Sequence, residues 1–258
     1  MTCFLAVFTL WQREVVRFFR QPSRVAGAAG SPLLFWILIG SGMRSSFHMP
    51  GSASNVSFLR YFYPGTVALV LLFAAIFSTI SVIEDRKEGF LQGVLVAPVP
   101  RGAVVAGKVA GGATLAWIQG MIFLPLAPLA GIGLSWGRAA EAAGVMALIS
   151  VALTALGFMF AWRVDSTQGF HAVMNLVLVP LWLLSGAFFP VAGGPSWLVW
   201  TMRANPLTYG VAALRNAFEP GMPTPGLPGA ALCVAILALA ALATFGLDLA
   251  VVRSRRRA

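Results

Sequence analysis

Charged residues are scarce in this chain, and their scarcity excludes a soluble fold. Only 10% of the 258 residues are charged and 59% are hydrophobic, whereas a soluble domain carries about 25% charged residues. A soluble fold of this composition would expose apolar patches far larger than the roughly few hundred Å² that soluble monomers tolerate. The solvent around most of the chain must therefore be lipid.

Cysteine and histidine are also rare, which excludes several kinds of site. Cys3 and Cys233 lie too far apart in sequence to indicate a disulfide framework. His48 and His171 have no acidic or cysteine residue nearby in sequence, which is typical of structural histidines. The apolar segments contain no cluster of His, Asp, Glu or Cys, so we expect no catalytic, cofactor or metal site and no enzymatic activity in this chain.

The net charge of +10 does not indicate a nucleic-acid partner. The basic residues lie between apolar runs and do not form one basic domain, a distribution typical of membrane topology signals. The first residues lack the basic region and cleavage site of a signal peptide, so we expect none.

Six apolar segments approach the length of about 20 residues that a membrane-spanning helix needs. Six spans place both termini on one side, and this side then carries thirteen of the 18 basic residues. The positive-inside rule therefore predicts cytoplasmic termini. We expect an all-α integral membrane protein with N-in/C-in topology and spans at Ala26–Met43, Phe62–Ile83, Val109–Ile132, Ala139–Trp162, Phe170–Phe189 and Gly229–Val252.

Residues 1–25 are expected to form an amphipathic helix before a transmembrane domain at residues 26–258. Four arginines recur at helical spacing on one face, next to aromatic and apolar residues. Such a helix can lie in the membrane interface and contact lipid, although a cytoplasmic helix packed on its own protein is the alternative. The arginines are Arg13, Arg17, Arg20 and Arg24.

The connection between the last two spans, residues 190–228, is apolar but interrupted by Gly and Pro. Irregular backbone at membrane depth must be buried in protein or line water. We therefore expect short re-entrant or interfacial helices on the outer side.

Residues 84–108, EDRKEGFLQGVLVAPVPRGAVVAGK, form the main polar interruption, and five charged residues open it in a row. Its last part resembles a phosphate-binding loop, but Val109 stands where the magnesium-binding Ser or Thr belongs, and the segment opens a span. Gly107 and Gly111 instead form a G-x-x-x-G pair that lets two helices approach closely. Lys108 is expected to extend its ammonium group back to the headgroups.

No energy source is visible in the chain itself. The intramembrane acids Glu141 and Asp248 fall near helix ends, where a charge reaches the interface cheaply. Without ATP hydrolysis or an ion path, uphill transport would need a partner, and the polar interruption is where a partner could act.

Two motifs carry a resemblance to a known family. The first runs from Glu84, Arg86, Glu88 and Gly89 through Pro98 and Arg101 to Gly107 and Lys108. The second is SGAFFP followed by NPLTY and an arginine, at Ser185, Gly186, Phe189, Pro190, Asn205, Pro206, Leu207, Thr208, Tyr209 and Arg215. With the six spans and the basic N-terminus, the chain resembles permease subunits of ABC type-2 exporters. It is most similar to the branch of daunorubicin-type drug-resistance permeases and nodulation-factor exporters, although GFLQGV after Glu88 departs from the common pattern and leaves the branch open.

The resemblance implies an exporter in the bacterial plasma (inner) membrane. Two permeases, usually alike, pair with two ATP-binding subunits, which bind ATP and magnesium. The first cytoplasmic loop couples to the ATPase, and the outer segment forms part of a gate at Pro190, Asn205, Pro206, Tyr209 and Arg215. Coupling would rest on Glu84, Asp85, Arg86, Lys87, Glu88, Gly89, Pro98 and Arg101.

The alternatives remain a solvated turn for the first motif and a turn with an interface anchor for the second. The expected cargo is a hydrophobic or amphipathic drug, lipid or lipid-linked glycan, because the spans are nearly free of charge. An ATP-independent channel or secondary carrier is the alternative function, but it predicts internal repeats, which the sequence does not show.

Overall fold

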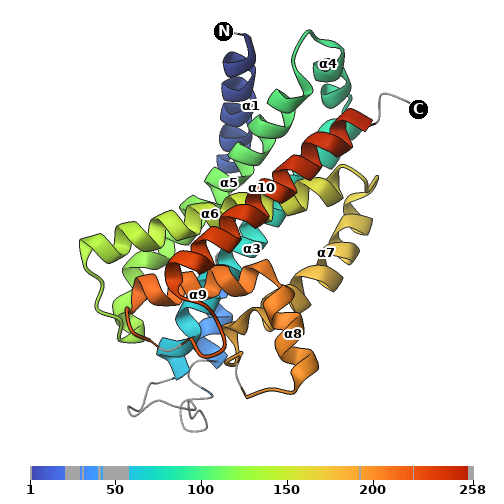
Figure 1. The fold of residues 1–258 in the computed structure, drawn as a ribbon. Helices are drawn as coiled ribbons and strands as arrows, with labels where there is room; N and C mark the ends of the chain where they lie inside the picture. Colours follow the sequence, from blue (N-terminus) through green and yellow to red (C-terminus); the bar gives the residue numbers. More distant parts are fainter. Residues whose placement is uncertain are drawn as a thin grey trace.

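The computed structural model describes residues 2–20, 30, 32–39, 42, 58–191, 193–222 and 224–254. These residues form helices and connecting turns without a β-strand (Figure 1), so the all-α expectation is confirmed. In chain order the elements are α1 (Thr2–Phe19), α3 (Phe58–Lys87), α4 (Phe90–Val96), α5 (Arg101–Phe123), η1 (Leu124–Ala130), α6 (Trp136–Ala161), α7 (Thr167–Trp182), η2 (Leu183–Ala187), α8 (Ser196–Ala204), α9 (Pro206–Phe218) and α10 (Ala230–Ser254).

Five helices in the described residues are long and apolar enough to cross a membrane. Each overlaps one of the second to sixth predicted spans. Eight of the 18 residues of the first predicted span, 26–43, lie outside the described residues, and its described residues 30, 32–39 and 42 are helical. The six-span topology and its orientation therefore stay predictions. The spans are Phe58–Lys87, Arg101–Ala130, Trp136–Ala161, Thr167–Ala187 and Ala230–Arg253.

α3 is the central helix of the bundle, and α10 lies at its edge. In the most apolar 18-residue window, 89% of α3 is buried but only 17% of α10. α10 instead exposes leucines such as Leu239 and Leu242. An exposed leucine row is unfavourable in water, but hydrocarbon chains solvate it well. The packing therefore agrees with a bundle whose rim faces lipid.

The polar interruption at 84–108 is mostly helical rather than a loop. α3 continues to Lys87, and Gly89 then adopts a left-handed conformation at φ 78°, which costs glycine little. The short helix α4 follows, and α5 begins at Arg101 directly after Pro100. Lys108 thus lies two turns inside α5.

Residues 190–228 contain the two short helices α8 and α9, as expected. α8 has nine residues and α9 thirteen, too few to cross a bilayer that needs about 20. Much of α9 is buried, and it lies beside α10 (Figure 1). Their depth in a membrane stays a prediction.

Candidate functional site

The charged part of the polar interruption meets α1 in one cluster of ion pairs. Arg13 donates hydrogen bonds of 2.7 Å to each carboxylate oxygen of Asp85. Arg17 donates to Asp85 at 2.8 Å and to Glu84 at 2.9 Å. Lys108 Nζ bonds Glu14 at 2.6 Å and also pairs with Asp85. We call these six residues the charge cluster: Arg13, Glu14, Arg17, Glu84, Asp85 and Lys108.

Two glycines allow α1 to reach this position. A Cβ atom on Gly107 would lie 2.7 Å from the Cβ of Leu10, and one on Gly111 would lie 2.6 Å from the Cβ of Glu14. Both distances are too short for real carbon atoms. The close helix approach expected for this glycine pair is therefore present, and the helix that approaches is α1.

The cluster is buried to an extent that the sequence did not indicate. The side chains of Asp85, Lys108 and Glu14 are 0%, 2% and 5% exposed. Buried charges are tolerated only when paired and hydrogen-bonded, which explains the dense network. Lys108 thus does not extend to the headgroups as expected, because two carboxylates lie nearer.

Two arginines of α1 pair with acidic residues of α3, while the placement of α1 in the membrane interface stays a prediction. Arg13 and Arg17 point to α3, and the guanidinium of Arg13 also lies 3.7 Å above the Phe90 ring of α4. The hydrogen bonds that Arg13 donates to Asp85, with nearby carboxylates, raise the pKa of Arg13 above its ordinary value, so it stays charged. Arg20 is exposed just after α1, and Arg24 lies outside the described residues.

The other predicted coupling residues differ in what they can contact. Asp85 is fully buried and cannot present its carboxylate to another subunit in this conformation. Arg86 donates to Asp165 at 2.9 Å and to the Ala161 carbonyl at 2.6 Å, which ties α3 to the end of α6. Arg101 donates to the Val252 carbonyl at 2.7 Å and so ties α5 to α10.

A smaller set of residues is open to a partner. Lys87 and Glu88 are exposed, and on α4 the side chain of Val96 is 88% exposed. Pro98 lies in the link between α4 and α5, and Gly89 sets the turn into α4. The exposed surface of this region is therefore α4 with its preceding turn.

At the other end of α3, the second motif surrounds a break in the fifth predicted span. The α-helix α7 passes into the π-helix η2, where Gly186 has a left-handed φ of 77°. The Gly186 carbonyl accepts hydrogen bonds from Tyr61 Oη at 3.0 Å and Arg215 Nη2 at 3.1 Å. The Arg215 guanidinium also lies 4.2 Å above the Tyr61 ring. One arginine and one tyrosine thus hold the broken turn.

Asn205 and Thr208 satisfy other carbonyls of this break. Asn205 Nδ2 donates to the Leu181 carbonyl at 2.6 Å, and its Oδ1 accepts from the Leu207 amide at 3.0 Å, which caps α9. Thr208 Oγ1 lies 3.2 Å from the Leu184 carbonyl and 2.6 Å from that of Met202. Freed backbone groups inside a membrane need such partners. We call Tyr61, Gly186, Asn205, Thr208 and Arg215 the helix-break cluster.

The remaining outer residues lie around this cluster. Pro206 starts α9, and Pro190 lies beside Tyr61 and Arg215. Tyr209 Oη donates to the Arg203 carbonyl at 2.8 Å and so fastens α9 to α8. A gate at these residues stays a prediction.

Sequence reasoning missed several residues. Glu14 and Tyr61 were not singled out, although Lys108 within an apolar run indicates a buried acidic partner. Asp248 was expected to reach the interface, but it is fully buried on α10, and its carboxylate has no hydrogen-bond partner in the described residues. It lies more than one turn from the helix end, on the face that packs inward, so its short side chain cannot reach water.

Both clusters lie in the part of the chain that matches one family of known proteins. The model for "ABC-2 type transporter" matches residues 6–218. The chain is 27% identical over 217 residues to the putative transport permease ycf38 of Cyanophora paradoxa, covering 83% of this chain and 74% of the relative. It is 28% identical over 209 residues to nodulation protein J of Rhizobium leguminosarum bv. trifolii, covering 80% and 78%.

A third relative is the inner membrane transport permease YadH of Escherichia coli, which is 23% identical over 221 residues. The match covers 83% of this chain and 83% of the relative. The family match takes in most of α1, the charge cluster and all of the helix-break cluster. The chain therefore belongs to the ABC-2 type transporter family of membrane transport permeases.

Proposed function

We propose that this chain is the membrane-spanning permease subunit of an ATP-driven exporter. It pairs with a second permease copy and with two copies of a separate ATP-binding subunit, which bind ATP and magnesium. It carries a hydrophobic or amphipathic cargo out across a bacterial inner membrane. The observation that carries this proposal is the exposed helix α4 joined through a buried charge cluster to the spans.

The coupling surface would be α4 and the turn before it. Leu91 anchors α4 with 3% exposure, while Val96 at its end is 88% exposed. Glu88 adds an exposed carboxylate. A short helix that is packed on one side and exposed on the other can fit into a groove of a partner protein.

The charge cluster would pass movement of α4 to the bundle. α4 follows α3 directly, and Phe90 of α4 lies under Arg13 of α1. Arg13 of α1 pairs with Asp85 of α3, and Asp85 pairs in turn with Lys108 of α5. A partner changes a conformational equilibrium only through contacts that differ between two states, and this short path offers such contacts.

Six spans with cytoplasmic termini remain part of the proposal. The start of α1, the end of α10 and α4 lie at the same end of the bundle (Figure 1). α3 begins at the opposite end, which supports a further crossing between α1 and α3. The similarity to YadH, an inner membrane transport permease, supports the inner membrane as the location.

The test is co-purification of an ATPase from native membranes. The tagged chain would be extracted in mild detergent, and mass spectrometry would identify its companions. The wild type should bring down a soluble protein with a phosphate-binding loop. The double variant Glu88→Lys/Val96→Asp should lose it at least about tenfold, the effect expected from removing one central contact of more than about 1.4 kcal/mol.

A matched control separates docking from general damage. Glu141→Lys reverses another exposed glutamate, at the start of α6, and should keep the ATPase. Absence of any ATPase with the wild type would instead favour the channel or carrier, which flux measurements in liposomes would then test. Retention by the double variant would exclude α4 as the docking surface.

A further inference from the structure

Asp248 is a buried acid on α10, the helix at the rim of the bundle. It lies within the apolar span Ala230–Arg253, of whose most apolar window only 17% is buried. Leu242 and Leu247 on the same helix are 68% and 53% exposed, whereas Asp248 is 0% exposed. The acid therefore points to the side on which α10 packs against the bundle, chiefly on α6, α9 and α5.

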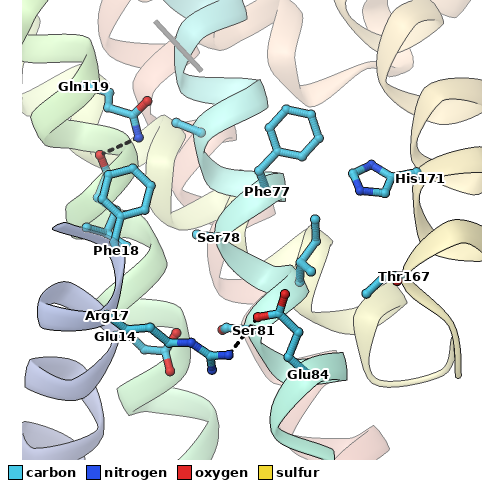
Figure 2. A pocket seen from close by; sticks show the side chains of 13 residues that line it. Glu14, Arg17, Phe18, Phe77, Ser78, Ser81, Glu84, Gln119, Thr167 and His171 are labelled. Atoms are coloured by element: carbon cyan, nitrogen blue, oxygen red, sulfur yellow. Dashed lines mark hydrogen bonds and ion pairs between the residues drawn. The ribbon is translucent and has the colours of Figure 1, made fainter. Parts of the chain in front are cut away.

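This acid differs from the acids of the charge cluster in having no cation beside it. Neither carboxylate oxygen of Asp248 has a hydrogen-bond partner in the part of the chain that the structure describes. In the charge cluster, Glu14 pairs with Lys108 at 2.6 Å, and Figure 2 shows Arg17 joined to Glu84 by a dashed line. A buried charge is tolerated only with such a partner. Asp248 thus lacks what a buried carboxylate needs.

The cations on α5 and α9 are engaged elsewhere. Lys108 belongs to the charge cluster, and Arg101 donates to the Val252 carbonyl at 2.7 Å. Arg215 donates to the Gly186 carbonyl at 3.1 Å. Each of these side chains therefore already has a partner of its own.

The other titratable side chains of these helices and of α10 itself are exposed or bonded to the backbone. Arg138 and Glu141 are exposed at the start of α6, and Arg253 is exposed at the end of α10. The Tyr209 hydroxyl of α9 donates to a carbonyl of α8, and the Cys233 thiol lies 3.3 Å from a backbone carbonyl. Among the described residues, none of them bonds the buried acid.

A bound proton is the partner that this place allows. It removes the charge of the carboxyl group, and a neutral carboxyl is far less unfavourable in an apolar interior than a carboxylate. The ionised form instead needs water or a cation. Since α10 is the least buried of the five spans, movement of this helix away from the bundle is the direct way to admit water.

We propose that Asp248 is a proton-binding site whose occupancy holds α10 against the bundle. With the proton bound, the neutral carboxyl stays in the packed position. When the proton passes to water, the carboxylate needs solvation, and α10 moves away from α6 to admit it. The other buried acids in the described residues, Glu14 and Asp85, are ion-paired, so this single site acts as a conformational switch and not as a proton path.

Infrared spectroscopy of the full chain tests for the proton directly. The carbonyl stretch of a neutral carboxylic acid is separate from the bands of carboxylates and amides, and a detergent without ester groups keeps this region clear. The difference between wild type and Asp248→Asn should contain one acid band, because asparagine has nearly the same shape and cannot bind the proton. Glu141→Gln, at an exposed acid, should keep the band. If Asp248→Asn does not fold, Asp248→Leu replaces it in the comparison.

Hydrogen exchange of the α10 amides tests the switch. An opening that releases one proton becomes about tenfold more frequent for each pH unit over the range in which the proton is lost. As pH rises, the wild type should therefore exchange increasingly faster than Asp248→Asn, by at least about tenfold, while the acid band fades over the same range. Comparing the proteins at equal pH removes the intrinsic pH dependence of exchange. Glu141→Gln should follow the wild type.

The outcomes separate this inference from the proposed function, beyond which it goes. A difference spectrum without an acid band would overturn the proton site and assign an ionised carboxylate to Asp248. A band that persists as pH rises, or an exchange ratio that does not change with pH, would overturn the switch. Neither result bears on the exporter, which the co-purification of an ATPase tests separately. A pH-dependent α10 without a co-purifying ATPase would keep the switch and remove the exporter.

Discussion

Lys108 Nζ lies 2.6 Å from the carboxylate of Glu14, although 94 positions separate the two residues in the chain. Lys108 pairs with Asp85 as well, and all three side chains are at most 5% exposed. These contacts fix α1 against α3 and α5, and the near-complete burial of the three side chains means that a lost partner would leave a buried charge unpaired. The stability of this end of the bundle therefore depends on complete pairing.

Replacing Lys108 by methionine should destabilise the protein strongly. Among the residues that the structure describes, Glu14 would keep only its 3.5 Å ion pair with Arg13, and breaking a buried pair costs about 3–5 kcal/mol. Unfolding by heat or denaturant in detergent would measure the loss. Lys87→Met removes the only other lysine, which is exposed, and should change little. Equal midpoints for the two variants would contradict a buried, paired Lys108.

A leucine at Gly111 should push α1 away from α5. The added side chain would meet Glu14, whose Cβ lies 2.6 Å from the position of the new Cβ, and overpacking of this kind costs about 1–3 kcal/mol. Hydrogen exchange of the α1 amides should become faster. Gly144→Leu in α6, where nothing lies within 4 Å, is the matched control. Unchanged protection of α1 in the Gly111 variant would show that this contact does not hold the helix.

Asn205→Leu should destabilise the outer end of the bundle by about 1–3 kcal/mol. The variant removes the hydrogen bonds to the Leu181 carbonyl and the Leu207 amide, and leaving a buried group unsatisfied carries a cost of this size. Thermal unfolding would measure it. Asn175→Leu, at an exposed position on α7, should have almost no effect. A variant as stable as the wild type would mean that Asn205 does not support the helix break.

Alanine at Gly186 and alanine at Gly246 should change stability in opposite directions. Gly186 has φ 77°, where a side chain costs about 1–2 kcal/mol. Gly246 lies in α10 with nothing within 4 Å, and alanine is better than glycine in a helix by about 1 kcal/mol. Melting temperatures should fall for Gly186→Ala and stay or rise for Gly246→Ala. A rise for both would show that the break at Gly186 relaxes without cost.

Much of the fold could be predicted from the sequence because a membrane-spanning helix is encoded by apolar residues at consecutive positions. The predicted span 139–162 corresponds to a helix at Trp136–Ala161, and the predicted span 229–252 to one at Ala230–Ser254. The short helices of the outer segment were also foreseen, since Gly and Pro interrupt an apolar run there. The family motifs were recognised for the same reason, as patterns over consecutive positions.

The role of individual charges could not be predicted in this way. Lys108 and Asp248 were both assigned to the interface from their distance to a span edge, and both are buried. For Lys108 the predicted start of the span was itself wrong, because α5 begins at Arg101 rather than near Val109. Which way a charge points on a helix depends on the helices around it.

The sequence by itself determined that this protein resides in a membrane, where five apolar helices lie and which family it belongs to, because hydropathy and motifs are properties of neighbouring residues. Only the tertiary structure decided that α1 joins the polar interruption through Arg13 and Asp85, 72 positions apart. It also decided that Tyr61 supports Gly186, 125 positions away. In an interior without water each buried polar group must find its partner in space, and the order of residues along the chain does not record where that partner is.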